Sequence, residues 1–237
     1  MPRAGKNRHR MRGIEILHED PDVIVIEKAA GILSCETRRG GEYTVEGALT
    51  DYVRKGQAKS RKCVYLVHRL DRETSGVMMV AKSPEVQEYF REKWNDITEK
   101  TYLALVHGHL EQSEGVFESY LAEDPKTLSV HSVKNAADGK LARTLYKVLH
   151  EVNDTSLVEV QLKSGRKNQI RVHFAESGHP VVGDARYGKG DGPLRLHAWR
   201  FAFVHPHSGK RLVFETACPA FALAPKPHFS RSAANMI

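Results

Sequence analysis

The sequence has few cysteines and no long apolar run. Cys35, Cys63 and Cys218 are the only cysteines among 237 residues, and no two of them form a C-x-x-C pair. Their number and spacing argue against a disulfide framework or a zinc knuckle, and they fit a reducing cytoplasm. The longest apolar runs, at 23–26 and 77–81, are far too short to span a bilayer. We therefore expect a cytoplasmic protein that does not enter a membrane.

Common catalytic and targeting motifs are missing as well. The chain has no G-x-G-x-x-G, G-x-x-x-x-G-K-[ST], H-E-x-x-H or G-x-S-x-G pattern, so no nucleotide, zinc-peptidase or serine-hydrolase signature is present. The basic N-terminus lacks the apolar core of a secretory signal and the Ser-rich character of a transit peptide. With 41% hydrophobic and 27% charged residues, the composition is that of an ordinary globular protein.

Positive charge is in excess, and its placement is informative. The net charge is +7 and the pI about 9.3, which favours an acidic partner such as nucleic acid. Residues 1–12 contribute five of these charges, and we expect a flexible basic arm there. A loosely held tail at 220–237 adds two. The body, 13–219, is neutral overall, but 54–72 carries seven basic residues against one acid, and 163–171 carries four against none.

Apolar periodicity predicts many strands and few helices. Helices are expected at 44–53, from Ser83–Pro84 to Ile97, and at 168–177, where Gly178 would end the helix. Because strands and helices do not alternate as βαβ units, we expect an α+β fold with a large, mixed and mainly antiparallel sheet. The expected strands are 15–18, 22–27, 63–67, 77–81, 101–107, 115–121, 142–152, 156–163, 194–204 and 211–217.

Asp71 is the first candidate for chemistry. It stands in a polar loop between two apolar strands, and such a loop can hold a catalytic side chain in a fixed position. Arg69 and Arg72 flank it, and nearby guanidinium groups favour the charged carboxylate. The alternative is a structural Asp that caps the turn at Thr74, and spacing alone favours this alternative.

A basic turn at 164–173 is the second candidate. Lys167, Gln169 and Arg171 would surround the start of a helix and form an anion-binding corner. The alternative is a solvated basic turn with Asn168 as the helix N-cap, and without further information this alternative is favoured.

Two H-x-H pairs are the third candidate, at 107–109 and 205–207. No acidic or Cys residue stands at an informative spacing from either pair, so surface histidines are favoured over a metal site.

A nine-residue block then connects these pieces. His68–Gly76 reads HRLDRETSG and resembles the HRLDxxTSG signature of the RluA-type pseudouridine synthases. The resemblance extends over roughly 13–219. It departs at Ala29, where the family usually has Pro, and at Asn168, where it usually has His. The supporting blocks, in order, are 28–31, 99–108, 165–173, 183–188 and 194–198.

The resemblance implies isomerisation of uridine to pseudouridine in ribosomal or transfer RNA, with no cofactor and no metal. It implies a pseudouridine synthase fold with an RNA cleft across the middle of the sheet. The implied catalytic residues are Asp71, which acts on the sugar, Tyr102, which stacks on the target base, and Arg171, which pairs with Asp71. The implied substrate-binding residues are Arg69, which fills the space left by the flipped uridine, and Ile170 and Leu196, which pack around the base.

The chemistry suits these residue types. The C1′–N1 bond must break and C5 must bond to C1′, and an anionic oxygen helps as charge develops at the anomeric carbon. Asp71 would either attack C1′ or draw a proton from the sugar. Removing the base from its stack costs a few kcal/mol, and stacking on Tyr102 would recover about 1–3 kcal/mol. On a strand, Tyr102 shares a face with Ala104 and Val106, so a core Tyr is the alternative.

The same residues bear on two rival functions, on the oligomeric state and on the domain content. An RNA-binding or chaperone protein without catalysis would be expected to lack Asp71, Tyr102 or Arg171, and all three are present. A glycoside hydrolase would need a second positioned carboxylate, and no motif supplies one. We expect a monomer without an N-terminal S4 RNA-binding domain. The basic stretches beside Asp71 and Arg171 predict salt-sensitive RNA binding even without the arm.

Overall fold

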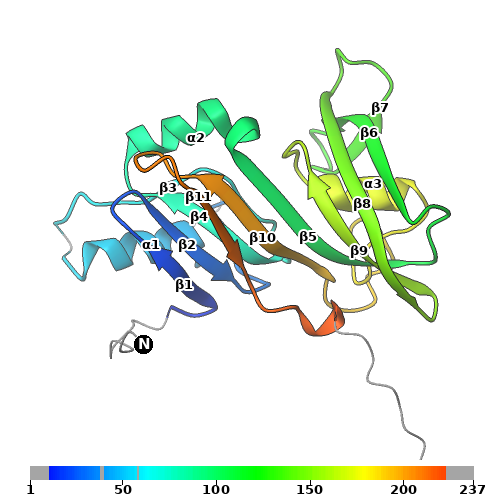
Figure 1. The fold of residues 1–237 in the computed structure, drawn as a ribbon, viewed down its shortest axis with the longest axis horizontal. Coiled ribbons are helices and arrows are strands. Elements are labelled where there is room, and N and C mark those ends of the chain that lie inside the picture. The colour runs from blue at the N-terminus through cyan, green and yellow to red at the C-terminus, as the bar shows by residue number, and fades with distance from the viewer. Residues whose placement is uncertain (1–10, 38–39, 58, 223–237) are drawn as a thin grey trace, which may run out of the picture.

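A computed structural model describes residues 11–37, 40–57 and 59–222. In these residues one sheet of 11 strands carries the fold, and three α-helices pack against it (Figure 1). The strand order is β1-β2-β4-β10-β5-β9-β8-β6-β7, with β3 paired to β4 and β11 paired to β10. Among the strands of the described ranges, β4 and β10 alone pair in parallel. The expected α+β fold with a mixed, mainly antiparallel sheet is confirmed.

The elements follow the expected order with small shifts in their ends. The helices are α1 (Val45–Arg54), α2 (Pro84–Ile97) and α3 (Gln169–Glu176), and a short 3-10 helix, η1, spans Ala220–Ala222. The strands are β1 (Ile14–Glu19), β2 (Val23–Lys28), β3 (Tyr65–Leu66), β4 (Ser75–Ala81), β5 (Thr98–His107), β6 (Glu114–Glu123), β7 (Val130–Val133), β8 (Lys140–Val152), β9 (Thr155–Leu162), β10 (Leu196–Val204) and β11 (Arg211–Glu215). None of the helices in the described ranges is long and apolar enough to cross a membrane.

The apolar runs of β2 and β4 are explained by burial on both faces. Alternate side chains of a strand point to opposite faces, and here each face is covered by a helix. A strand covered on both sides reads as a continuous apolar run and not as an alternating one. The residues facing α1 include Ile24, Ile26, Met78 and Val80, and those facing α2 include Val23, Val25, Val77 and Met79.

The helix ends test the capping expectations. Ser83 caps α2 through its side chain, which accepts a hydrogen bond from the Val86 amide, and Pro84 is the first helical residue, as expected. Thr44 caps α1 in the same way, so that helix begins one residue later than expected. Asn168 occupies the N-cap position of α3, as expected, but its backbone is left-handed and its side chain makes no cap hydrogen bond. Gly178, just beyond α3, has the left-handed φ of +84° typical of a helix end.

Other expectations need correction. The strand expected at 63–67 shortens to β3, and β7 was not expected at all. The tail is not loosely held throughout, since η1 places Ala222, 6% exposed, in a small cluster with Leu103 and Leu157. In the basic arm, Met11 packs against the main core. Residues 1–10 and 223–237 lie outside the described residues, so the rest of both predictions stays untested.

Two lobes meet along the long strand β5. Figure 1 shows β1, β2, β4, α1 and α2 in one lobe and β6 to β9 with α3 in the other. Strand β5 pairs with β10 on one side and with β9 on the other, so it belongs to both lobes. This arrangement brings the loop before β4 and the loop before α3 to the same region of the sheet.

Candidate active site

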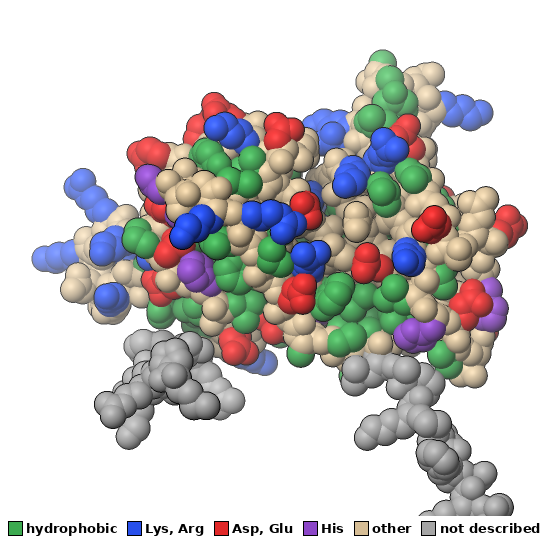
Figure 2. All heavy atoms as spheres, in the orientation of Figure 1, with side chains coloured by type: hydrophobic (Ala, Val, Ile, Leu, Met, Phe, Trp, Pro, Cys, Tyr) green, Lys and Arg blue, Asp and Glu red, His purple; other side chains and the backbone are tan. Residues whose placement is uncertain are grey.

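A cleft of about 610 Å³ lies between the two lobes. The loop before β4, the end of α2, the start of β5 and the loop leading into α3 form its walls. On the face drawn in Figure 2, Lys and Arg side chains border the notch between the lobes. The only acids in the lining are Asp71 and Glu123, so the cleft is strongly positive and suits a polyanion. Its basic lining residues are Arg69, Arg91, Lys100, Arg166, Lys167 and Arg171.

The backbone on both sides of Asp71 is fixed by the segment that follows β2. The Ser34 hydroxyl donates to the Leu70 carbonyl at 2.7 Å and accepts from the Leu70 amide at 3.1 Å. On the other side, the Gly31 amide donates to the Arg72 carbonyl at 2.8 Å. Asp71 therefore stands on an anchored loop, and its side chain, 28% exposed, lines the cleft.

Lys28 adds a further anchor to this loop. It is fully buried at the end of β2, and burial lowers the pKa of its ammonium group to about 8, although Glu73 and Asp71 oppose this shift. Nζ donates to the carbonyls of Ala29, Ile32 and Arg72 at 2.9–3.1 Å, which satisfies the buried ammonium. Sequence reasoning quoted Lys28 within the block 28–31 but gave it no role.

The departure at Ala29 has a structural explanation. The Ala29 amide donates to the Gly13 carbonyl at 2.8 Å, a bond that proline could not make because it has no N–H. The chain thus replaces a rigid turn residue with a hydrogen bond to the start of the fold.

Gly76 allows β4 and β10 to approach each other behind the Asp71 loop. Its φ is +114°, and a Cβ atom on it would lie 2.1 Å from the Ala198 carbonyl oxygen. Ser75 and Gly76 pair in parallel with His197 and Ala198. Glycine at the end of the signature is therefore a steric requirement of the sheet beneath the site.

Arg171 connects two aspartates. Its Nε and Nη2 each lie 2.7 Å from a carboxylate oxygen of Asp184, and its Nη1 lies 3.5 Å from Oδ2 of Asp71. The pair expected from the resemblance is thus close, but Arg171 binds Asp184 more tightly. Burial opposes the charge on Arg171, yet Asp184, with help from Asp71, raises its pKa.

Asp184 is a site residue that sequence reasoning missed. It is fully buried, and it accepts backbone hydrogen bonds from Arg186 and Tyr187, both at 2.9 Å. Burial raises its pKa, but Arg171 and these amides outweigh burial and lower the pKa overall. The sequence feature that could have identified it is its place in the block 183–188, which resembles the family but was given no function.

The remaining expected site residues also reach the cleft. Tyr102, on β5, is 8% exposed and belongs to the main core cluster while it also lines the cleft. Burial raises its pKa, and the charge of Asp71 adds to the effect. Ile170 and Leu196 are each 4% exposed and line the same cleft, whereas Arg69 is exposed beside Asp71.

Two polar residues of the candidate motifs have internal partners. His68 accepts a hydrogen bond from the Met79 amide at 3.0 Å and stacks on Phe201. Burial of its ring, together with the charge of Lys100, lowers its pKa to about 3. Gln169 was expected in an anion-binding corner but is buried, and its amide bonds to Ser164 and Thr144. Both side chains therefore shape the walls of the cleft.

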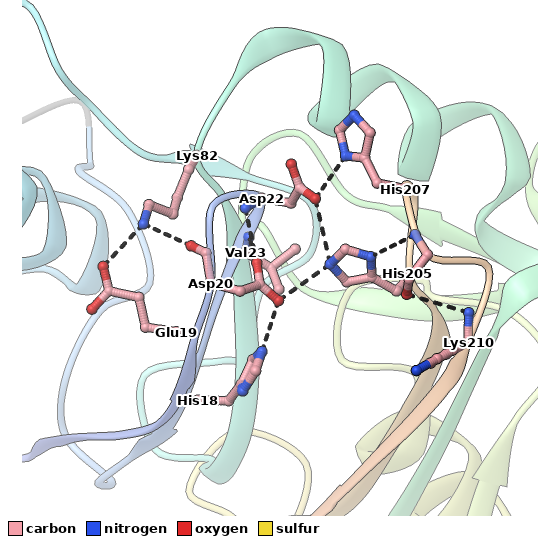
Figure 3. Close-up of polar contacts among 10 residues, drawn as sticks. His18, Glu19, Asp20, Asp22, Val23, Lys82, His205, His207 and Lys210 are labelled. Atoms are coloured by element: carbon pink, nitrogen blue, oxygen red, sulfur yellow. Dashed lines mark hydrogen bonds and ion pairs between the residues drawn. The ribbon is translucent and has the colours of Figure 1, made fainter.

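A second group of histidines and aspartates lies where the β1–β2 turn meets the β10–β11 turn (Figure 3). Asp20, Asp22 and His205 bring three donor atoms within 4.8 Å of one another, close enough to hold a metal ion. His207 Nδ1 donates to Oδ2 of Asp22 at 2.7 Å, and His18 contacts Asp20 at the same distance. No acidic residue stands near the 205–207 pair in the sequence, because its acidic partners come from 185 residues away.

The hydrogen bonding of His205 decides between a proton and a metal. Its Nδ1 accepts from the Ser208 amide at 3.2 Å, so the ring hydrogen is on Nε2. Nε2 then donates toward Asp20 and Asp22, at 3.2 and 3.4 Å. A metal ligand would need a lone pair on this nitrogen, so the group is better explained as a hydrogen-bonded cluster that joins the two turns.

Comparison with known proteins agrees with this geometry. A sequence model of the family described as RNA pseudouridylate synthase matches residues 22–176. The chain is 35% identical over 221 residues to "Ribosomal large subunit pseudouridine synthase D" of Nitrosomonas europaea, covering 87% of this chain and 62% of that protein. It is 32% identical over 210 residues to "Uncharacterized RNA pseudouridine synthase YjbO" of Bacillus subtilis, covering 87% and 73%.

The fold comparison agrees as well. The solved structure "Human RNA Pseudouridylate Synthase Domain Containing 4" superposes with a TM-score of 0.70 at 25% identity, covering 87% of this chain and 89% of that one. The match to the family extends from β2 to α3 and so includes both the Asp71 loop and Arg171. The chain belongs to the RNA pseudouridylate synthase family, in its RluA-type branch.

Proposed function

We propose that this protein isomerises uridine to pseudouridine in RNA, with Asp71 as the catalytic residue and without a cofactor. The observation that carries the proposal is a partly exposed carboxylate, Asp71, held on an anchored loop in a basic cleft with Arg171 3.5 Å away. A polyanionic substrate suits the cleft, and a charged carboxylate suits chemistry at the sugar.

The reaction conserves all atoms of the nucleotide. The C1′–N1 bond breaks, the uracil turns, a C1′–C5 bond forms, C5 gives up its proton and N1 gains one. Asp71 either attacks C1′ or takes a proton from the sugar, and the developing charge at the anomeric carbon favours an anionic oxygen in both routes. Asp184 is buried and bound by Arg171, so it does not supply the second carboxylate of a hydrolase.

The walls of the cleft support a flipped base. Tyr102 would stack on the uracil, while Ile170 and Leu196 would pack around it, and all three line the cleft from buried positions. Arg69 is exposed beside Asp71 and would fill the space that the uridine leaves. Stacking on an aromatic ring contributes about 1–3 kcal/mol and offsets part of the cost of unstacking.

Ribosomal RNA is the substrate that the relatives favour. Proteins from Nitrosomonas europaea and Buchnera aphidicola that are named ribosomal large subunit pseudouridine synthases are each 35% identical to this chain. The chain spans 62% and 65% of their lengths. We assign residues 13–219 as the catalytic unit, acting as a monomer in the cytoplasm.

Mapping of pseudouridine in total RNA tests this function. Cells without the gene are compared with cells that carry the wild-type protein, Asp71→Asn or Asp51→Asn, a control on the exposed face of α1. We expect the wild type and the control to restore one or more sites in ribosomal RNA and Asp71→Asn to restore none. A site restored by Asp71→Asn would exclude the proposed mechanism. RNA binding with no site restored by the wild type would favour an RNA-binding protein instead.

A further inference from the structure

Asn168 has an unusual backbone for a buried residue. It directly precedes α3 with φ 54° and ψ 18°, it is 9% exposed, and its side chain makes no hydrogen bond that caps the helix. Asn tolerates the left-handed region better than most residues, but the conformation still needs a compensating contact. Asn168 lines the cleft beside Asp71, and the compensating contact is between its side-chain amide and the Asp71 carboxylate.

The orientation of the Asn168 amide follows from its neighbours. With its oxygen toward Asp71, the amide would face carboxylate oxygens that carry no hydrogen. With its nitrogen toward Asp71, the amide donates to Oδ2 at 2.8 Å and to Oδ1 at 3.3 Å, and its oxygen accepts from the Tyr187 hydroxyl at 3.0 Å. In the first orientation the oxygen lies against the carboxylate with only a long contact, at 3.5 Å, from Arg171 Nη1, so the second orientation is favoured.

Tyr187 fixes this orientation. Its hydroxyl oxygen accepts a hydrogen bond from the Val130 amide at 2.9 Å, so its own hydrogen is free to point at Asn168. The guanidinium of Arg171 lies over the Tyr187 ring, 5.2 Å from its centre. A directed chain therefore runs from the Val130 N–H through the Tyr187 hydroxyl and the Asn168 amide to Asp71.

We propose that Asn168, oriented by Tyr187, is a positioning residue for the catalytic carboxylate. The proposal rests on the proposed function. Arg171 commits two of its nitrogens to Asp184 and reaches Asp71 at 3.5 Å, whereas the Asn168 amide lies 2.8 Å from it. Both partners lie closest to Oδ2, which leaves Oδ1 as the freer oxygen for the sugar. The departure from the usual His of the family is thus part of how this chain holds Asp71.

Asn168→Asp is the direct test, since it keeps the size of the side chain and tolerates the left-handed backbone. It replaces the donor with an oxygen facing Asp71. The substrate is a transcript spanning the mapped uridine, labelled with tritium at C5 so that turnover releases tritium. We expect kcat to fall by about 10–100-fold, through loss of one hydrogen bond to a charged group and repulsion between the two carboxylates, with KM changed by less than about twofold because RNA contacts are retained.

Two further variants separate positioning from folding. Asn153→Asp changes an exposed Asn with nearly the same backbone, φ 53°, and should keep wild-type kcat. Tyr187→Phe should lower kcat by about 3–10-fold alone but add little in the Asn168→Asp background, because Tyr187 acts through Asn168.

The outcomes are distinguishable from failure of the proposed function. A wild-type protein without turnover would overturn that function. Turnover in the wild type, its loss in Asp71→Asn and wild-type kcat in Asn168→Asp would overturn only the role of Asn168. The positioning role would also be overturned if Asn168→Asp lowered the melting temperature and changed KM and kcat together, with Tyr187→Phe fully additive.

Discussion

Two aspartate clusters in this protein use similar residues in different surroundings. The cleft cluster consists of Asp71, Asn168, Arg171 and Asp184, and the distal cluster consists of His18, Asp20, Asp22, His205 and His207 (Figure 3). Each joins an aspartate to partners from distant parts of the chain. Only the cleft cluster presents an aspartate, Asp71, to a cavity.

The difference lies in what remains free on each carboxylate. Oδ1 of Asp20 accepts the Asp22 and Val23 amides, both at 2.8 Å, and Oδ2 contacts His18 and His205. At Asp71, the close contacts fall on Oδ2, and Oδ1 has only the longer contact with Asn168, at 3.3 Å. A carboxylate whose two oxygens are both hydrogen-bonded within the protein stabilises the fold. A carboxylate held mainly through one oxygen leaves the other available to a substrate.

The largest effect on stability and kcat is expected at Asp184, which holds Arg171 of the cleft cluster in place. Asp184→Asn keeps the shape but leaves Arg171 half-compensated in a buried position, and breaking a buried ion pair costs about 3–5 kcal/mol. We expect a clear fall in melting temperature and, at a temperature where the variant is folded, a lower kcat. Tritium release and thermal unfolding measure the two effects.

The control for this variant is Asp138→Asn, an exposed change far along the chain in the β7–β8 turn. It should leave stability and kcat unchanged. If Asp184→Asn were folded and fully active, Arg171 would not need Asp184 to act on Asp71, and the cleft cluster would be two independent pairs.

A smaller effect, on stability alone, is expected in the distal cluster. Asp20→Asn retains the acceptor for the turn amides but places a donor against His18 and His205, which should cost about 1–3 kcal/mol. Despite burial, the hydrogen bond to His18 and the turn amides lower the pKa of Asp20 below its ordinary value of 3.8. The carboxylate therefore stabilises the fold above that value, and its contribution is lost as pH falls through the lower, folded value.

Denaturant unfolding at pH 7 and near pH 3 measures this effect. The difference between wild type and Asp20→Asn should be full at pH 7 and should shrink at the lower pH, while kcat at pH 7 stays at the wild-type value. A variant that unfolds normally but loses kcat would show that the distal cluster communicates with the cleft, contrary to the comparison.

The sequence was sufficient where local rules and a specific block decide the structure. Ser83 and Pro84 predict the start of α2, because capping depends on residues close in sequence. The signature places Asp71 in a loop between strands, and the fold class follows from the order of strands. The identity of the pieces around the cleft was therefore predictable.

Contacts made by the tertiary fold were not predictable from spacing. A local rule placed Asn168 at the start of a helix, and it is there, but its side chain contacts Asp71 and Tyr187 instead of capping the helix. Asp184 binds Arg171 from 13 residues away, and His205 meets Asp20 across 185 residues. No periodicity encodes such pairs, because each depends on how separate loops pack.

The smallest effect is expected from Lys100, on the wall of the cleft. Burial, with the charge of Arg166, lowers its pKa to about 8, so its ammonium is charged at pH 7 and loses its charge as pH rises through about 8. If it faces an RNA phosphate, affinity for a ribosomal RNA fragment should fall by a few fold between pH 7 and 9, with the bound anion moving the transition upward.

Lys100→Arg should remove this pH dependence, because arginine stays charged. Lys100→Gln should bind more weakly at both pH values and lower the salt slope by about one. Lys210→Gln, beside the distal cluster, is the matched control and should behave as wild type in fluorescence anisotropy. An unchanged pH dependence in Lys100→Arg would place the titrating group elsewhere and restrict Lys100 to shaping the wall. The expected result instead makes the cleft respond to pH near 8 through ligand binding, whereas Asp20 in the distal cluster acts on stability, and its contribution is lost in acid below 3.8.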